Sequence, residues 1–261
     1  ILHSHVPYYQ GLVHAPQIPE MTLCPSTTTG SSTLHWMLTA EIANKLSTAS
    51  SKKVDKSAEY LRILTERIEK TKEHWNSIRQ VAVEMTRRIR QGGRWFVRSL
   101  EHPGFQSELH GVASGPSIVN WGNWEKSKMH NVMLINAISP GYPTEIKLAQ
   151  EKQVEGAYVI GIGPDSLDGE STHGRLIDVA DVGFNNFSSE LEGIIKIPGS
   201  PKQICPTSGI VGNVIQQMIC AQWTDEMVRR GSVPYFWMGY FQAGGRPYYN
   251  AINPFFESRG F

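Results

Sequence analysis

The chain has 261 residues, of which 40% are hydrophobic, and its 25 basic and 24 acidic residues give a formal net charge of +1. This length and composition predict one large domain, or one domain with an arm. Because the charge is balanced and no apolar run is long enough to cross a bilayer, we expect neither nucleic acid nor a membrane as a partner. The three cysteines lack metal-ligand spacing, and we expect no cofactor.

The first 32 residues are rich in proline and in hydroxyl side chains and show no periodicity. Residues 1–32 are therefore predicted to form an extended arm. His3 and His5 have the His-x-His spacing of metal sites, but no third ligand accompanies them, and no metal is expected. Because the chain begins with Ile1 and not with Met, removal of an upstream signal peptide, and hence export, stays open.

Two helices are predicted next, at residues 33–47 and at residues 55–90. In the second, Asp55 is a suitable N-cap and Gly92 with Gly93 a suitable end. Its apolar residues recur at alternating three- and four-residue steps, which predicts one stripe along a long helix. Such a stripe packs either within the chain or against a second subunit. The stripe consists of Leu61, Leu64, Ile68, Thr71, Trp75, Ile78, Ala82, Met85 and Ile89.

The most informative stretch follows residue 131. Residues 132–138 form an apolar run of strand length, residues 144–153 have helical spacing, and residues 157–162 form a second apolar run. This order predicts a βαβ unit in a parallel sheet. The turn Ser139–Thr144 places hydroxyls at a helix N-terminus, where free N–H groups and the dipole favour an anion. An ordinary connection with a capping threonine explains the turn equally well.

The remaining elements are shorter or less regular. Residues 204–209 introduce a long helix that ends at Gly231, and residues 234–261 are rich in aromatic side chains that must pack against the body. Short strands are predicted at residues 94–97, 117–121, 178–184 and 193–197.

Several motifs occur in an order that resembles the sugar isomerase (SIS) domain family, in particular its phosphoheptose-isomerase-like members. The resemblance covers roughly residues 33–255, and it rests on the ordered set because each motif alone is weak. The motifs are I-S-P-G-Y-P-T-E at residues 138–145, G-A-Y-V-I-G-I at 156–162, D-V-A-D-V at 178–182, P-T-S-x-x-x-G at 206–212, and the C-terminal A-G-G-R-P-Y-Y-N at 243–250.

This resemblance implies an α/β fold: a three-layer sandwich with a five-stranded parallel sheet of the flavodoxin-like SIS type. Long N-terminal helices and the extended arm would precede it, and residues 33–261 would form the phosphosugar-binding domain. The resemblance further implies a homodimer, a sugar phosphate as ligand and a cytoplasmic location.

The same resemblance assigns site residues. Glu108 falls where the isomerases have their catalytic base, and His102 falls where some relatives have a loop histidine. Tyr249 stands where the family has a histidine before the C-terminal asparagine. The resemblance therefore assigns no clear residue as the acid that opens the sugar ring. The phosphate- and substrate-binding positions are Ser139, Thr144, Thr207, Ser208 and Asn250.

Two classes of function fit these residues. The first is an enzyme acting on a phosphorylated sugar, as an isomerase or a related lyase, with Glu108 as base and His102 or His110 as acid. The second is a non-catalytic module that senses a sugar or a sugar phosphate, which the replacement of the C-terminal histidine favours. A nucleotide-binding Rossmann site is set aside, since no G-x-G-x-x-G turn follows the first strand of the sheet.

Overall fold

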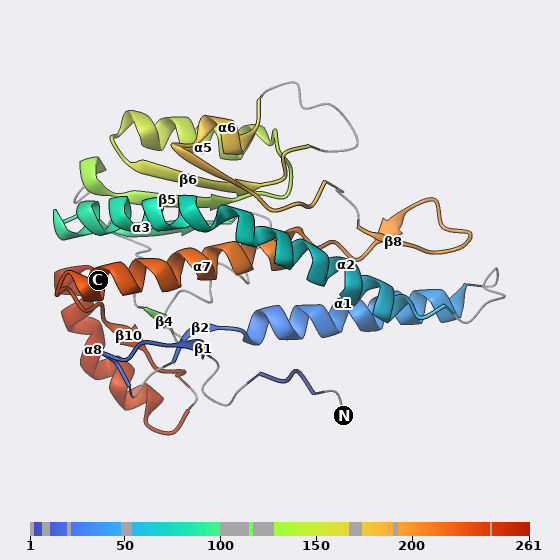
Figure 1. Ribbon diagram of the computed structural model, residues 1–261, viewed down its shortest axis with the longest axis horizontal. Coiled ribbons are helices and arrows are strands. Elements are labelled where there is room, and N and C mark those ends of the chain that lie inside the picture. The colour runs from blue at the N-terminus through green and yellow to red at the C-terminus, as the bar shows by residue number, and fades with distance from the viewer. Residues whose placement is uncertain are drawn as a thin grey trace.

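The computed structural model describes residues 3–6, 11–19, 22–47, 54–99, 115–116, 128–166, 174–189, 193–240 and 242–261. Figure 1 shows a mixed α/β architecture in which helices lie on both faces of a parallel sheet. Two long helices, α1 (Thr27–Leu46) and α2 (Lys56–Lys70), pack together and extend beyond the sheet on one side.

The sheet contains four parallel strands in the order β3-β5-β6-β7. The predicted βαβ unit is confirmed, because the two apolar runs form β5 and β6, which pair in parallel. The described residues supply four of the five strands that the resemblance implies, and the predicted strand at 117–121 lies outside them. The strands are β3 (Trp95–Arg98), β5 (Val132–Asn136), β6 (Tyr158–Gly163) and β7 (Val182–Asn185).

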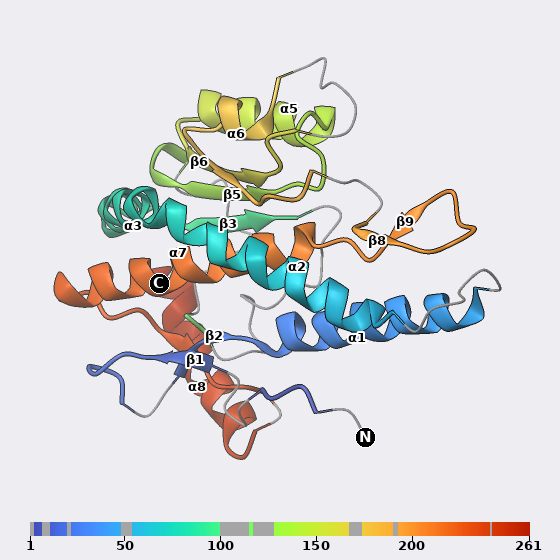
Figure 2. The same ribbon diagram turned by 45° about the vertical axis from the view of Figure 1, so that its right-hand side comes forward.

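Helices cover both faces of the sheet, and the side chains of each strand alternate between them. Leu134 on β5 joins the core formed with α3 and α7, whereas its neighbour Ile135 joins the core formed with α5 and α6. A parallel sheet buried on both faces explains why its strands appear in the sequence as unbroken apolar runs. The layers, compatible with a three-layer α/β sandwich, are visible in Figure 2. The covering helices are α3 (Trp75–Arg90), α5 (Pro143–Val154), α6 (Leu176–Val179) and α7 (Ser208–Arg229).

The long helix predicted at 55–90 is two helices, α2 and α3, joined by the 3₁₀ turn η1 (Thr71–His74). Asp55 caps α2 as predicted, accepting a hydrogen bond from the Ala58 N–H at 2.8 Å. At the break, the Thr71 hydroxyl donates to the Ile68 carbonyl oxygen at 2.7 Å, a contact that competes with the helical ladder.

The predicted stripe is buried only in part. Most of its residues are buried within the chain, but Leu61 remains 42% exposed and Trp75 remains 50% exposed. Leu61 lies on α2 before the 3₁₀ turn and Trp75 directly after it, so the stripe is exposed at both places. Helix α1 also begins earlier than predicted, at Thr27.

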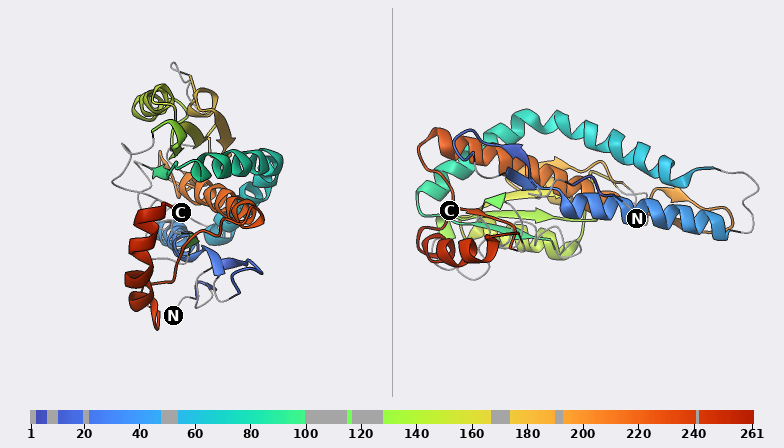
Figure 3. Two further views of the ribbon diagram at one scale, coloured as in Figure 1. Left: turned by 90° about the vertical axis from the view of Figure 1, so that its left-hand side faces the viewer. Right: turned by 90° about the horizontal axis from the view of Figure 1, so that it is seen from below.

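Helix α7 lies in the middle of the molecule and is covered on more than one side. It packs on α3, and the rings of Trp95 and Trp223 lie 6.0 Å apart beneath the sheet. Its other side meets a hairpin of β1 (Gly11–His14) and β2 (Thr22–Pro25), so the predicted arm contains a two-stranded antiparallel sheet. Figure 3 shows these tiers from the side and from below.

The C-terminal tail packs against the body, as its aromatic content predicts. Phe236, Trp237 and Phe256 are buried. The residues predicted as a strand at 178–184 begin with α6 and enter β7 only at Val182. Among the helices of the described residues, none has both the length and the apolar character needed to cross a bilayer. The remaining elements are β4 (Gly115–Pro116), η3 (Lys128–His130), β8 (Ile195–Lys196), β9 (Gln203–Ile204), β10 (Phe236–Trp237) and α8 (Gly245–Arg259).

Candidate functional site

The carboxyl ends of the four parallel strands meet at one edge of the sheet, and α7 begins at the same edge (Figure 1). In open α/β sheets, ligands bind outside this edge. Both predicted hydroxyl loops reach it: Ser139 follows β5, and Thr207 immediately precedes α7. The edge is therefore the natural place to look for a site.

A cluster of polar side chains surrounds the start of α7. The hydroxyl oxygens of Thr207 and Ser188 lie 2.8 Å apart in a hydrogen bond, and both residues are buried. Arg67 on α2 donates from Nη1 to the Thr207 hydroxyl oxygen at 2.5 Å. Thr207 is the N-cap residue of α7, yet its side chain makes no capping hydrogen bond. The cluster thus turns the Thr207 hydroxyl away from the N–H groups of the first helical turn.

The electrostatics of this cluster favour an anion. Arg67 is half-buried, and this burial lowers the pKa of its guanidinium. The 22-residue helix α7 adds the positive end of its dipole at the same place. The Tyr60 hydroxyl donates to the Pro206 carbonyl oxygen at 3.2 Å, and burial raises the pKa of that phenol.

Strained backbone flanks the cluster on both sides. Phe187 has φ of 55° and Cys205 has φ of 65°, values that are rare for residues with a side chain. Such strain is concentrated at functional sites, where the surrounding structure imposes it. The Phe187 ring stacks on His74 with ring centroids 5.4 Å apart, and His74 Nε2 lies 2.7 Å from the Asn185 carbonyl oxygen.

Asn136 closes the end of β5 with an amide that has no partner. The residue is buried, and within the described part of the chain neither its Nδ2 nor its Oδ1 makes a hydrogen bond. It lies against α7 at Gly212, where a Cβ atom would come within 2.5 Å of Asn136 Nδ2. An unpaired buried amide costs roughly 1–3 kcal/mol, so polar atoms of a ligand would be favourable here.

The two predicted loops share the edge but lie on opposite faces of the sheet. The loop after β5 lies beside α6, because the Pro140 carbonyl accepts a hydrogen bond from the Leu176 N–H at 2.7 Å. Ser139 is half-buried and Thr144 is exposed. Tyr142, and not Thr144, is the N-cap residue of α5. Within the described residues, no hydrogen bond joins Ser139 or Thr144 to Thr207.

Of the predicted site residues outside the two hydroxyl loops, only Asn250 lies within the described part of the chain, and it is not at the α7 cluster. Glu108, His102 and His110 lie outside the described residues. Asn250 is exposed on α8, a helix at the opposite end of α7 from Thr207 (Figure 1). The end of α8 reaches the amino end of the sheet, where Arg94 donates to the Glu257 carbonyl oxygen at 3.0 Å.

Three residues of the cluster were not among the predicted site residues. Ser188 lies in the polar sequence Asn-Asn-Phe-Ser-Ser, directly after a strand. Polar residues just after a parallel strand indicate candidate ligand-binding positions, because ligands bind at that edge of the sheet. Asn136 is a polar residue at the end of an apolar run and gave the same signal. Arg67 gave none, because it is one charged residue among many on α2.

The described residues contain no group of three or more His, Cys, Asp or Glu side chains able to hold a metal ion. What the edge offers is hydrogen-bond donors: a guanidinium, hydroxyls, an amide and the N–H groups of a helix start. No protein-family model matches the chain, and no curated protein matches it either.

Proposed function

We propose that the protein binds a sugar phosphate at the carboxyl edge of its sheet, with the phosphate group at the N-terminus of α7. The observation that carries this proposal is the cluster of Arg67, Thr207 and Ser188 around the first turn of a long helix. The first N–H groups of a helix have no partner within the helix, and a phosphate can accept from them.

The chemistry of the cluster supports a phosphate. A guanidinium matches phosphate oxygens with two parallel donors, and charge-assisted hydrogen bonds are roughly twice as strong as neutral ones. Sugar hydroxyls both donate and accept, which suits the unpaired amide of Asn136 and the hydroxyl of Ser139 along the same edge. The motif order that resembles the SIS family supports the same ligand class.

The proposal extends to catalysis through Glu108. Isomerisation of a sugar phosphate moves a proton between neighbouring carbons, and Glu108 is the proposed base, with His102 as the proposed acid. The alternative is a sensing module that binds without chemistry, favoured by Tyr249 in place of the family histidine. Replacing Glu108 by Gln separates them: the enzyme loses solvent deuterium exchange into the sugar by about 10²-fold, and the sensor shows no exchange in the parent protein.

Binding is tested by calorimetric titration of a panel of sugar phosphates, each paired with its unphosphorylated sugar. We expect at least one phosphate ester to bind at least tenfold more tightly than its sugar. Thr207→Val should remove most of that preference, because it loses the hydroxyl beside Arg67. Thr144→Val is the matched comparison on the other loop, and its smaller effect would assign the phosphate to α7. Equal binding of every pair would refute the proposal.

We also propose a homodimer. Leu38, Ile42 and Leu46 are exposed at four-residue spacing along α1, whereas most of the predicted stripe on α2 and α3 is buried within the chain. Light scattering at micromolar concentration should give twice the 29.2 kDa mass of one chain. A particle of one-chain mass would contradict this assembly.

A further inference from the structure

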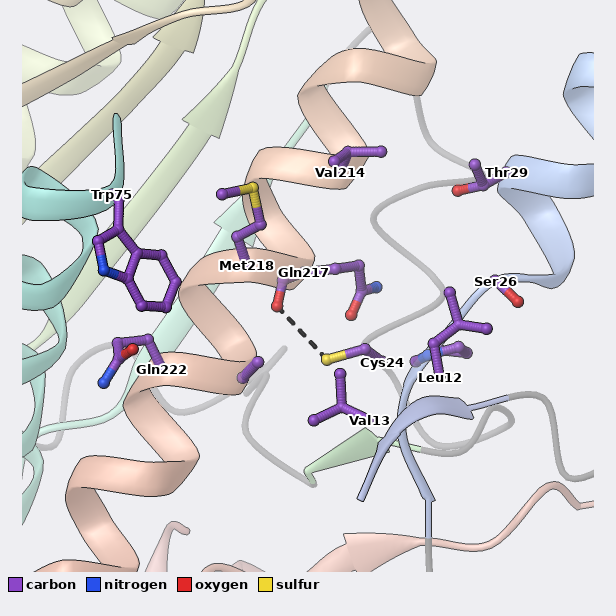
Figure 4. A pocket seen from close by; sticks show the side chains of 12 residues that line it. Leu12, Val13, Cys24, Ser26, Thr29, Trp75, Val214, Gln217, Met218 and Gln222 are labelled. Carbon is purple, nitrogen blue, oxygen red and sulfur yellow. Dashed lines mark hydrogen bonds between the residues drawn. The ribbon is translucent and has the colours of Figure 1, made fainter. Parts of the chain in front are cut away.

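A cavity lies on the outer face of α7, away from the sheet. Its volume is about 460 Å³, and it extends from Trp75 on α3 to the β1–β2 hairpin and the start of α1 (Figure 4). Small-molecule pockets usually measure roughly 300–1,000 Å³, so this cavity is large enough for one ligand. Five of its wall residues share one face of α7: Val214, Gln217, Met218, Ala221 and Gln222.

The wall of this cavity is mainly apolar and carries no charge among the described residues that form it. Leu12 and Val13 of the hairpin face it together with Met218 and Trp75, and all but Met218 leave much of their side chain exposed. An indole and a thioether are adaptable contact surfaces for apolar molecules. The exposed apolar side chains at the rim would be covered by a bound molecule.

Four wall residues are polar, namely Ser26, Thr29, Gln217 and Gln222, and of these only Gln217 is buried. Gln217 is only 9% exposed, and neither its Nε2 nor its Oε1 makes a hydrogen bond to any described residue. Figure 4 shows its side chain pointing from α7 towards the hairpin and the start of α1. Its backbone carbonyl, by contrast, is engaged by the Cys24 thiol at 3.4 Å. A buried amide without partners is costly, and a ligand that pairs with it recovers that cost.

We propose that this pocket binds a neutral, mainly apolar small molecule with one amide-like head group, which pairs with the Gln217 side chain. An amide both donates and accepts on neighbouring atoms, so it satisfies Nε2 and Oε1 of Gln217 together. A carboxylate would lose its hydration without meeting a positive side chain on the described wall, and it is therefore disfavoured.

The shape of the site favours a small molecule over a second protein chain. The cavity has about three times the volume of the ~150 Å³ cavity that binds benzene in another protein, and the unpaired amide of Gln217 is buried in its wall. Strand β1 is mostly exposed and pairs with β2 alone within the described residues, whereas Leu23 and Cys24 of β2 are buried. Strand β1 is therefore the part of the wall best able to adjust to a ligand head.

The probe is octanamide, compared by calorimetric titration with N,N-dimethyloctanamide and octanoate at neutral pH. We expect octanamide to bind at least tenfold more tightly than either analogue, because only octanamide offers both a donor and an acceptor. Gln217→Leu should bring the affinities of the two amides within twofold of each other. Ala221→Phe, which fills the cavity, should weaken octanamide binding at least tenfold, while Ala251→Phe on the exposed side of α8 should not change it.

Several results would overturn this inference. These are no octanamide binding at millimolar concentration, equal binding of the two amides by the parent protein, or a preference that survives Gln217→Leu. If Ala221→Phe halves the particle mass in light scattering without affecting octanamide, the pocket is a subunit interface and the inference is also wrong. The binding of sugar phosphates is measured separately and should be unchanged in both pocket variants, so each proposal fails independently.

Discussion

The proposed phosphate site and the outer cavity both lie on α7, but they differ in whether their polar side chains are already hydrogen-bonded. At the N-terminus of α7, the hydroxyls of Thr207 and Ser188 bond each other and Arg67. On the outer face of α7, Gln217 keeps an unpaired amide in an apolar wall. A network whose members are already paired is rigid and holds its shape before a ligand arrives. A single unpaired amide, by contrast, gains its hydrogen bonds only when a ligand binds.

The difference also separates the expected ligands. The α7 N-terminus combines a partly buried guanidinium with a helix dipole, and both favour negative charge. The outer face offers contact area and one neutral head position. A substitution at one site should therefore leave binding at the other unchanged, and the following predictions use that independence.

The largest effect is expected from Arg67→Met. Removing the guanidinium deletes charge-assisted hydrogen bonds worth roughly 1.5–3 kcal/mol, so sugar-phosphate affinity should fall by about 10- to 150-fold. Octanamide binding should not change. Arg62→Met is the matched control, because Arg62 lies on the same helix but is exposed and pairs with Glu66. Equal losses in the two variants, measured by calorimetry, would show that Arg67 acts only through net charge.

Gly212→Ala tests the close approach of α7 to the end of β5. The new Cβ atom would come within 2.5 Å of Asn136 Nδ2, and overpacking a buried site costs about 1–3 kcal/mol of unfolding free energy. Urea denaturation measures this loss. The double variant Asn136→Ala with Gly212→Ala should lose less than the sum of the two single variants, because the clash is gone. Strict additivity would contradict the contact.

A smaller effect is expected from Tyr60→Phe, which removes the hydrogen bond to the Pro206 carbonyl. At neutral pH the variant should be about 1 kcal/mol less stable. Burial raises the folded-state pKa of Tyr60, so its stabilisation is complete below the unfolded value of about 10 and is lost as the pH rises above it. The gap between parent and variant should therefore narrow above about pH 10. Urea denaturation at neutral pH and above about pH 10 measures the difference in unfolding free energy between parent and variant. If this difference is the same at the two pH values, the assignment is wrong.

Much of the sheet and its helices could be predicted from the sequence, because periodicity reports burial directly. The apolar runs at β5 and β6 were predicted as strands buried on both faces, and they pair in parallel as expected. Asp55 and Gly92 lie at the two ends of the helical region, also as predicted. The break at Thr71 was missed because the apolar stripe continues through it. A local side-chain hydrogen bond, and not a change in pattern, ends α2 there.

The site was harder to predict, because its parts come from distant segments. Thr207 was expected from its helix start, but its neighbours Arg67 and Ser188 lie 140 and 19 residues away in the chain. No local pattern marks such a convergence. The hairpin at residues 11–25 was also missed, because its strands are short and one of them is mostly exposed. The pocket beneath it follows from that packing and has no sequence signature.

The most direct test of the central claim is a crystal structure with the tightest-binding sugar phosphate from the calorimetric panel. We expect phosphate oxygens within hydrogen-bonding distance of the first N–H groups of α7 and of the Arg67 guanidinium, with the sugar towards Asn136 and Ser139. A phosphate bound at any other place, such as the amino end of the sheet near Arg94, would contradict the claim.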